Sequence, residues 1–195
     1  FYMTLKSIKE RLSKKAVAIQ LPIGAESSFS AIIDLIEMKA FKFEGDHGMN
    51  ITPFDIPADM MDEVKKYRTE LLEKVAEASD ELMNKYLNGE EFTVEEIRTA
   101  IRTLVLKDEI YPVMCGSALG NKGVQLMLDA VTYYLPSPSD VPTIMGTDLN
   151  DEEKKIEVHA ADNEPFVGLA FKIATDPFVG KLAFFRVYSG SIQSG

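Results

Sequence analysis

Residues 57–87 read PADMMDEVKKYRTELLEKVAEASDELMNKYL, and their apolar side chains recur at every third or fourth position. The recurring residues are Met60, Val64, Tyr67, Leu71, Val75, Ala78, Leu82 and Tyr86. Because this spacing gathers them on one side of an α-helix, we expect one continuous helix with a buried stripe. Pro57 suits the first helical turn, where no backbone N–H is needed, and Asn88-Gly89 suits a left-handed helix end.

A second helix is predicted directly after this one. Thr93 and Glu96 have the spacing of a capping box, in which each side chain bonds the backbone N–H of the other residue. Ile97, Ile101 and Leu104 then recur at helical spacing. The two helices are therefore expected to form an antiparallel hairpin.

Short apolar segments precede the hairpin. An amphipathic helix is predicted over residues 1–13. Apolar or alternating runs separated by turn residues predict strands at 16–21, 29–36, 39–43 and 50–56. We expect these strands to form a small antiparallel sheet.

After the hairpin, a strand is predicted at 110–114 and a helix at 123–135. The helix is expected to bury one apolar side. That side consists of Val124, Met127, Leu128 and Val131.

The C-terminal part of the chain changes character. Residues 139–164 are rich in Pro, Asp, Glu and Lys and are expected to be a linker. Strands are predicted at 166–173 and 181–188, with a third at 191–194. Three strands without closure leave unpaired edges, so we expect a β-barrel that ends early and can self-associate through those edges.

The composition narrows the classes of partner. A net charge of −10 disfavours non-specific binding to nucleic acid and suits docking to basic protein surfaces, although solubility alone would also explain it. The single cysteine, Cys115, excludes an internal disulfide and indicates a reducing, cytoplasmic location. No apolar run approaches the roughly 20 residues that span a bilayer, so no membrane partner is expected.

Residues that could carry chemistry are few. His47 and His159 stand alone in polar segments, without a second ligand at metal-binding spacing, so no metal site is expected. Cys115 has no recognisable base nearby in sequence and is interpreted as a small buried thiol. Neighbouring acids such as Glu95 and Glu96 point in different directions on a helix and are interpreted as a solvated face. We therefore expect no catalytic residue in this chain.

The sequence lacks the G-x-x-x-x-G-K-[ST] loop that cradles nucleotide phosphates. The segment Gly120-Asn121-Lys122-Gly123 contains the Asn-Lys pair of the guanine-reading Asn-Lys-x-Asp motif, but Val124 stands where the aspartate belongs. The chain alone is therefore not expected to bind GTP or GDP, and no cofactor is expected in it.

Seven segments, in order along the chain, resemble the bacterial elongation factor G family. They are LPIGAE (21–26), IPADM (56–60), KYLNGEE (85–91), CGSA with NKGVQ (115–118 and 121–125), YLPSP (134–138), EPF with DPFVGK (164–166 and 176–181) and RVYSG (186–190). The resemblance covers essentially the whole chain. The family is a ribosomal translocase driven by GTP hydrolysis, so it implies a parent GTPase that uses GTP and Mg²⁺ in translation.

The resemblance also divides the chain. Residues 1–15 and 110–142 would be the C-terminal part of a P-loop-type GTPase domain, interrupted by an α+β insertion at 16–109. Residues 143–164 would link this domain to the start of a second-domain β-barrel at 165–195. The expected fold class is therefore α+β or α/β, with a small antiparallel sheet and a helical hairpin in the insertion. The phosphate loop, the switch regions and the Asn-Lys-x-Asp motif would lie upstream.

One part of a nucleotide site would remain. Ser117, Ala118 and Leu119 match the family's last guanine motif, in which backbone N–H groups contact the guanine oxygen. Small residues suit a turn that a base must approach closely. Without the resemblance, the needs of a turn at Gly116 and Ser117 are the simpler explanation.

The other candidate site is acidic. Between residues 77 and 96 the chain has seven acidic residues against one lysine. In this family the insertion meets the mobile stalk protein of the large ribosomal subunit, which presents basic residues. Glu77 and Glu81 are four residues apart and are expected to share a helix face that docks this protein, with help from Asp80. A purely solvated acidic face is the alternative.

The parent protein would bind the ribosome through this stalk contact, and its complete second domain would meet the small subunit and rRNA. The chain itself is expected to be limited to stalk docking. An end at Gly195 inside an unclosed barrel favours an excised fragment over a self-sufficient domain. Two alternatives stay open: a fragment of a related ribosome-associated translational GTPase, and a stand-alone, non-catalytic interaction domain.

Overall fold

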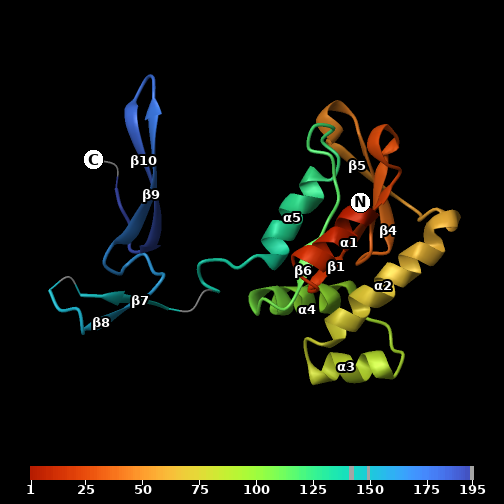
Figure 1. Ribbon diagram of the computed structural model, residues 1–195, viewed down its shortest axis with the longest axis horizontal. Helices are drawn as coiled ribbons and strands as arrows, with labels where there is room; N and C mark the ends of the chain where they lie inside the picture. The colour runs from red at the N-terminus through yellow and green to blue at the C-terminus, as the bar shows by residue number, and fades with distance from the viewer. Residues whose placement is uncertain (141–142, 149, 194–195) are drawn as a thin grey trace. The chain divides into compact units, whose positions relative to one another are not determined.

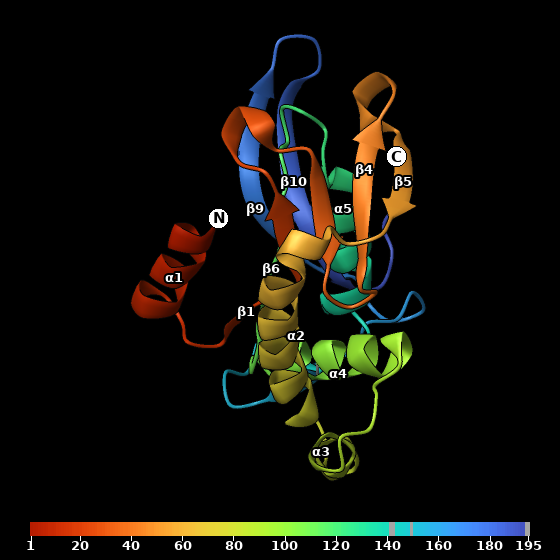
Figure 2. The same ribbon diagram turned by 90° about the vertical axis from the view of Figure 1, so that its right-hand side faces the viewer.

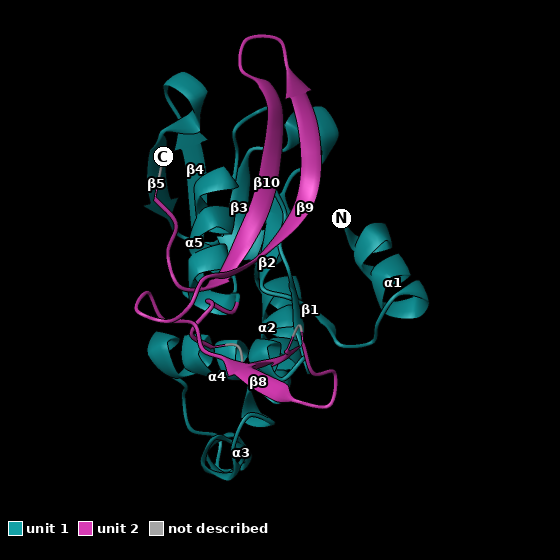
Figure 3. Cartoon of the chain, turned by 90° about the vertical axis from the view of Figure 1, so that its left-hand side faces the viewer, with its two compact units in different colours: residues 1–135 teal, residues 136–195 magenta. Residues whose placement is uncertain are grey.

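The computed structural model describes residues 1–140, 143–148 and 150–193. The chain divides into two compact units, residues 1–135 and 136–195 (Figure 3). The described residues form five α-helices and four small sheets (Figure 1), so the fold is mixed α+β. None of the helices in these residues is long and apolar enough to cross a lipid bilayer.

Unit 1 (residues 1–135) is organised around a four-stranded antiparallel sheet. Its strands follow one another in sequence order: β2 (Gln20–Ile23), β3 (Ala31–Asp34), β4 (Lys39–Glu44) and β5 (Asn50–Phe54). This sheet confirms the antiparallel sheet predicted from the apolar runs.

A second, parallel pair joins β1 (Ala16–Ala18) to β6 (Tyr111–Val113). The strand predicted at 16–21 is therefore divided between two sheets. The reason is that the chain changes partner at Ile19, whose N–H donates to the Val113 carbonyl at 3.0 Å while its carbonyl accepts from Leu35 at 3.0 Å.

Helices pack around these sheets. The five α-helices are α1 (Tyr2–Arg11), α2 (Met61–Ala76), α3 (Asp80–Leu87), α4 (Val94–Leu106) and α5 (Val124–Tyr134). Single turns of 3-10 helix occur at η1 (Glu26–Ser28), η2 (Asp46–Gly48) and η3 (Ala58–Met60). The core combines strand side chains such as Ile33 with the buried sides of α2 and α4, which include Leu71 and Ile97.

The predicted start of α4 is confirmed. The Thr93 hydroxyl accepts a hydrogen bond from the Glu96 N–H at 3.2 Å, and the Glu96 carboxylate accepts from the Thr93 N–H at 2.7 Å. Two of the N–H groups that a helix start leaves without partners are thereby satisfied.

The single helix predicted over residues 57–87 is wrong. α2 ends at Ala76 and α3 starts at Asp80, with Ser79 in an extended conformation before it. The Ser79 hydroxyl accepts a hydrogen bond from the Leu82 N–H at 3.2 Å and so caps the new helix. The apolar spacing continues across this break and hides it, although a serine followed by two acids is itself a helix-start signal.

The side of α5 that was expected to be buried is largely exposed. Met127, Leu128 and Val131 expose 48%, 56% and 46% of their surface. The helix instead rests on α4 near its C-terminal end, where the Arg98 guanidinium lies 4.7 Å from the centre of the Tyr133 ring. Helical spacing shows which side chains share a side of a helix, but it does not supply an element to cover that side.

Unit 2 (residues 136–195) contains two antiparallel pairs. β7 (Ile144–Thr147) pairs with β8 (Lys155–Val158), and β9 (Val167–Asp176) pairs with β10 (Gly180–Ser189). The long strands of the second pair confirm the two strands predicted there. Most of their side chains are exposed, because a two-stranded ribbon has no second layer to pack against.

Two expectations for unit 2 differ from the structure. The segment expected to be a linker, 143–164, contains the β7–β8 hairpin, whose loop is closed by a Lys154–Asp148 ion pair at 3.0 Å. A polar composition suggested a linker, but backbone pairing does not need apolar side chains. Residues 191–193 form no strand, and residue 194 of the third predicted strand lies outside the described residues.

Candidate functional site

The acidic residues gather at one end of unit 1. Both views place α3 at the end remote from the β2–β5 sheet (Figure 1 and Figure 2). Glu77 is the C-cap of α2, whereas Asp80 and Glu81 lie in the first turn of α3, and all three are exposed. The expectation that Glu77 and Glu81 share one helix face is wrong, because the break at Ser79 puts them on different helices.

The three predicted docking residues differ in how far their charge is compensated. Lys74 Nζ lies 2.8 Å from a Glu77 carboxylate oxygen. Among the residues that the structure describes, no lysine, arginine or histidine pairs with Asp80 or Glu81. The positive end of the α3 dipole favours carboxylates in the first turn of that helix. Asp80 and Glu81 are therefore among the exposed acids of this end whose charge no cationic side chain compensates in the described residues.

Lys85 and Glu96 join α3 to α4. Lys85 Nζ lies 2.7 and 2.9 Å from the two Glu96 carboxylate oxygens, and Glu96 also accepts hydrogen bonds from Thr93. The hydrogen bond from Lys85 contributes most to lowering the pKa of Glu96 to about 2, and those from Thr93 lower it further. Glu96 thus has a structural role, and only the fold shows its pairing with Lys85.

The candidate guanine-binding residues form a tight turn between β6 and α5. The Ser117 N–H donates to the Lys122 carbonyl at 2.9 Å, and the Lys122 N–H donates to the Ser117 carbonyl at 3.0 Å. Inside the turn, the Gly120 N–H donates to the Ser117 hydroxyl at 3.2 Å, and the Asn121 N–H donates to the Ala118 carbonyl at 3.2 Å. The N–H of Ser117 is therefore already used within the turn.

The next two N–H groups are available to a ligand. Those of Ala118 and Leu119 donate to no other atom in the part of the chain that the structure describes. Both residues are exposed, and Leu119 is fully so. Successive free backbone N–H groups can donate to an anion or a carbonyl oxygen. The structure thus makes Ala118 and Leu119 possible donors and leaves Ser117 a supporting role.

A hollow of about 900 Å³ opens beside this turn. Its walls come from α1, from the segment between β2 and β3, and from residues 115–117, and they include Phe1, Leu5 and Phe29. Its described lining contains no lysine or arginine side chain. The hollow therefore offers the phosphates of a nucleotide no cationic side chain.

Cys115 begins the loop after β6. Its N–H donates to the buried Gln20 Oε1 at 3.5 Å, and burial raises the pKa of its thiol to about 12. The thiol is therefore protonated at neutral pH and is a poor nucleophile. Within the described residues, no group of three or more His, Cys, Asp and Glu side chains is placed to hold a metal ion.

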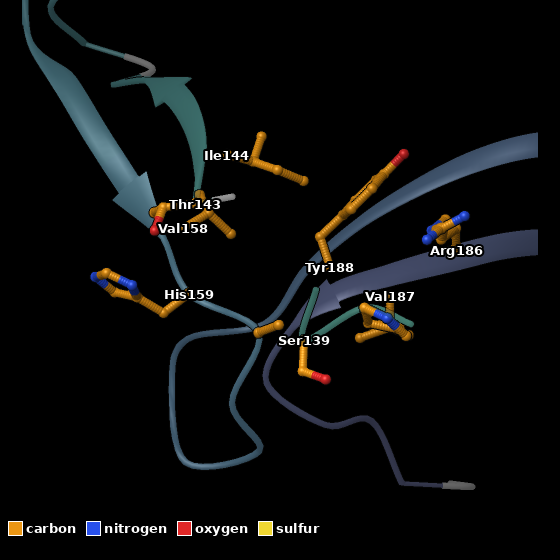
Figure 4. A pocket seen from close by; sticks show the side chains of 10 residues that line it. Ser139, Thr143, Ile144, Val158, His159, Arg186, Val187 and Tyr188 are labelled. Carbon is orange, nitrogen blue, oxygen red and sulfur yellow. The ribbon is translucent and has the colours of Figure 1, made fainter. Parts of the chain in front are cut away.

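Unit 2 has a smaller hollow of about 290 Å³. Figure 4 shows His159 and Arg186 on opposite sides of Tyr188. The Arg186 guanidinium lies 5.5 Å from the centre of the Tyr188 ring, and His159 Nε2 lies 3.6 Å from a Glu157 carboxylate oxygen. The polar groups do not converge on one point, so this hollow is a weaker candidate than the acidic end or the turn.

Comparison with solved structures finds likenesses to this fold. A crystal structure of a protein from Thermus thermophilus matches 97% of this chain with a TM-score of 0.72 and 26% sequence identity. The match covers 25% of that protein, so this chain spans a quarter of its length. No protein-family model matches the chain.

Proposed function

We propose that this chain is a segment of a translational GTPase that resembles bacterial elongation factor G, and that its own contribution is to dock a basic protein domain. The observation that carries the docking proposal is the pair of exposed carboxylates at Asp80 and Glu81. They start a helix at the far end of unit 1 and have no cationic partner among the described residues. A basic partner would meet both charges without first displacing an internal ion pair.

Two facts support the wider proposal. The seven segments that resemble elongation factor G run in order along the chain, and the fold recurs within a protein about four times as long. In this proposal residues 1–15 and 110–142 complete a P-loop-type GTPase domain, residues 16–109 are its insertion, and residues 165–195 begin a β-barrel. GTP and Mg²⁺ would be held mainly by segments upstream.

The proposed partner is the basic domain of the large-subunit stalk protein on the ribosome, in the cytoplasm. Long-range attraction between opposite charges raises association rates and is weakened by salt. Glu77 would contribute less than its two neighbours, because Lys74 already compensates its charge.

The test measures the association rate with the purified stalk-protein domain at several ionic strengths. Asp80→Lys with Glu81→Lys should slow association at low salt and flatten its salt dependence. Glu152→Lys with Glu153→Lys is the matched control, since it changes the net charge equally at exposed acids of unit 2. Circular dichroism should show both variants folded, because exposed charges contribute under ~1 kcal/mol to stability. Equal association rates for the two double variants would refute docking at Asp80 and Glu81.

A further inference from the structure

Two side chains near the start of α5 reach backbone carbonyls of the β2–β5 sheet. Lys122 Nζ donates to the Phe29 carbonyl and lies 5.7 Å from the centre of the Phe29 ring. Gln125 Nε2 donates to the Gly48 carbonyl at 3.0 Å. Phe29 precedes β3, whereas Gly48 lies between β4 and β5. Two separate loops of the sheet therefore hold the end of the turn and the first residues of α5 that follow it.

The backbones also meet closely at this place. A Cβ on Gly48 would lie 2.5 Å from the Asn121 carbonyl oxygen, and a Cβ on Gly123 would lie 2.5 Å from Cδ1 of the buried Ile32. Both glycines have a positive φ, a conformation that other residues adopt only at a cost. The turn is thus seated directly on the sheet, with no space for a side chain between them.

Gln125 has a polar group that packing does not explain. Its Oε1 is buried and accepts no hydrogen bond in the described part of the chain. A buried acceptor without a donor is unfavourable, and an apolar side chain of similar length would avoid that cost. What the apolar side chain could not do is donate to the Gly48 carbonyl. The presence of an amide therefore points to that bond as its purpose.

We infer that Lys122 and Gln125 are positioning residues that fix the 117–122 turn to the sheet. Their bonds determine where the free N–H groups of Ala118 and Leu119 stand. The inference rests on the proposed function, because in a translational GTPase that resembles elongation factor G those N–H groups would meet the 6-oxygen of guanine.

Its consequence concerns the inserted segment. Residues 16–109 supply the carbonyls of Phe29 and Gly48, although they lie outside the segments assigned above to the GTPase domain. The insertion would therefore act on guanine recognition as well as carry the acidic docking end.

The anchoring can be tested first in this chain, without nucleotide. Amide hydrogen exchange at Ser117 and Lys122, whose N–H groups close the turn, should become about tenfold faster in Lys122→Met, as for the loss of one charge-assisted hydrogen bond. Gln125→Met should also accelerate it, because methionine keeps the length but cannot donate. Lys122→Arg should restore slow exchange, and Lys14→Met, at an exposed lysine, should leave it unchanged. Unchanged exchange in both Lys122→Met and Gln125→Met would overturn the inference.

The role in recognition can be tested in the longer protein with two nucleotides. GDP carries the 6-oxygen, whereas 2-aminopurine riboside diphosphate lacks it. Lys122→Met and Gln125→Met should weaken the binding of GDP several-fold and leave the binding of the 2-aminopurine nucleotide unchanged. Lys122→Arg should restore the affinity for GDP. A general loss of folding stability would instead weaken the binding of both nucleotides alike.

The outcomes separate the two proposals. If the wild-type protein binds GDP and the variants weaken the binding of both nucleotides equally, the proposed function stands and the positioning role is wrong. If the wild-type protein binds neither nucleotide, the proposed function is wrong and the role in guanine recognition falls with it. The exchange measurement then still decides whether Lys122 and Gln125 hold the turn.

Discussion

Truncation of Leu71 to alanine should show how much of unit 1 depends on α2. Leu71 lies on the buried side of α2, exposes 0% of its surface and belongs to the hydrophobic core of unit 1. The change removes three carbons, each worth about 0.8 kcal/mol of burial, and leaves a cavity that adds to the cost. We therefore expect Leu71→Ala to lower the free energy of unfolding by about 3 kcal/mol. For a chain of this length that loss lowers the melting temperature by about 10 °C.

The control is the same substitution at Leu87, which exposes 73% of its surface at the end of α3. Leu87→Ala should change the free energy of unfolding by less than about 0.5 kcal/mol, as surface substitutions commonly do. Thermal unfolding followed by circular dichroism at 222 nm compares the two variants with the wild-type chain, because the helices that give this signal lie in unit 1. If both variants melt within about 2 °C of each other, α2 does not anchor the core as described.

Two further outcomes are expected. The pKa of Glu96 lies at about 2 in the folded chain, below its ordinary value of 4.5, so its stabilising effect is present above pH 4.5 and is lost as the pH falls towards 2. Glu96→Gln should make the urea midpoint depend less on pH within that window, and an unchanged pH dependence would contradict the pairing with Lys85. The β9–β10 ribbon exposes Phe171 and Ile173 by 65% and 74%, so its amides should exchange rapidly in a dilute monomer and become protected as the chain self-associates at higher concentration. Slow exchange throughout 167–176 in a demonstrably monomeric sample would argue against this.

Much of unit 1 could be predicted because its signals are local. The capping box at Thr93 and Glu96 needs only residues three apart, and the antiparallel strands follow one another with short connections. Such features depend on backbone donors and acceptors close together in the chain. They can therefore be predicted from the order of the residues.

The candidate sites were predicted only in part. The sequence placed acidic residues together, but it did not show that Lys74 and Lys85 compensate Glu77 and Glu96 and leave Asp80 uncompensated. The Lys74–Glu77 pair is only three positions apart at the end of α2, so residue spacing could have predicted it. The Lys85–Glu96 pair joins two helices and depends on how they pack, and residue spacing does not contain that information. The same limit explains why the sequence identified a turn at Ser117–Ala118 without showing which N–H groups stay free.

By itself, then, the sequence determined the alternation of strands and helices in unit 1, the start of α4 and the acidic character of the α3 end. The tertiary structure showed that Ser79 divides the long helix, a break that the serine and the two acids after it signal locally but that the continuing apolar spacing hides. It alone brought Lys122 to Phe29 and Gln125 to Gly48, which lie 93 and 77 positions apart in the chain. Such contacts form where packed elements meet, and the physical reason is that folding selects them through burial of the whole core rather than through any local pattern.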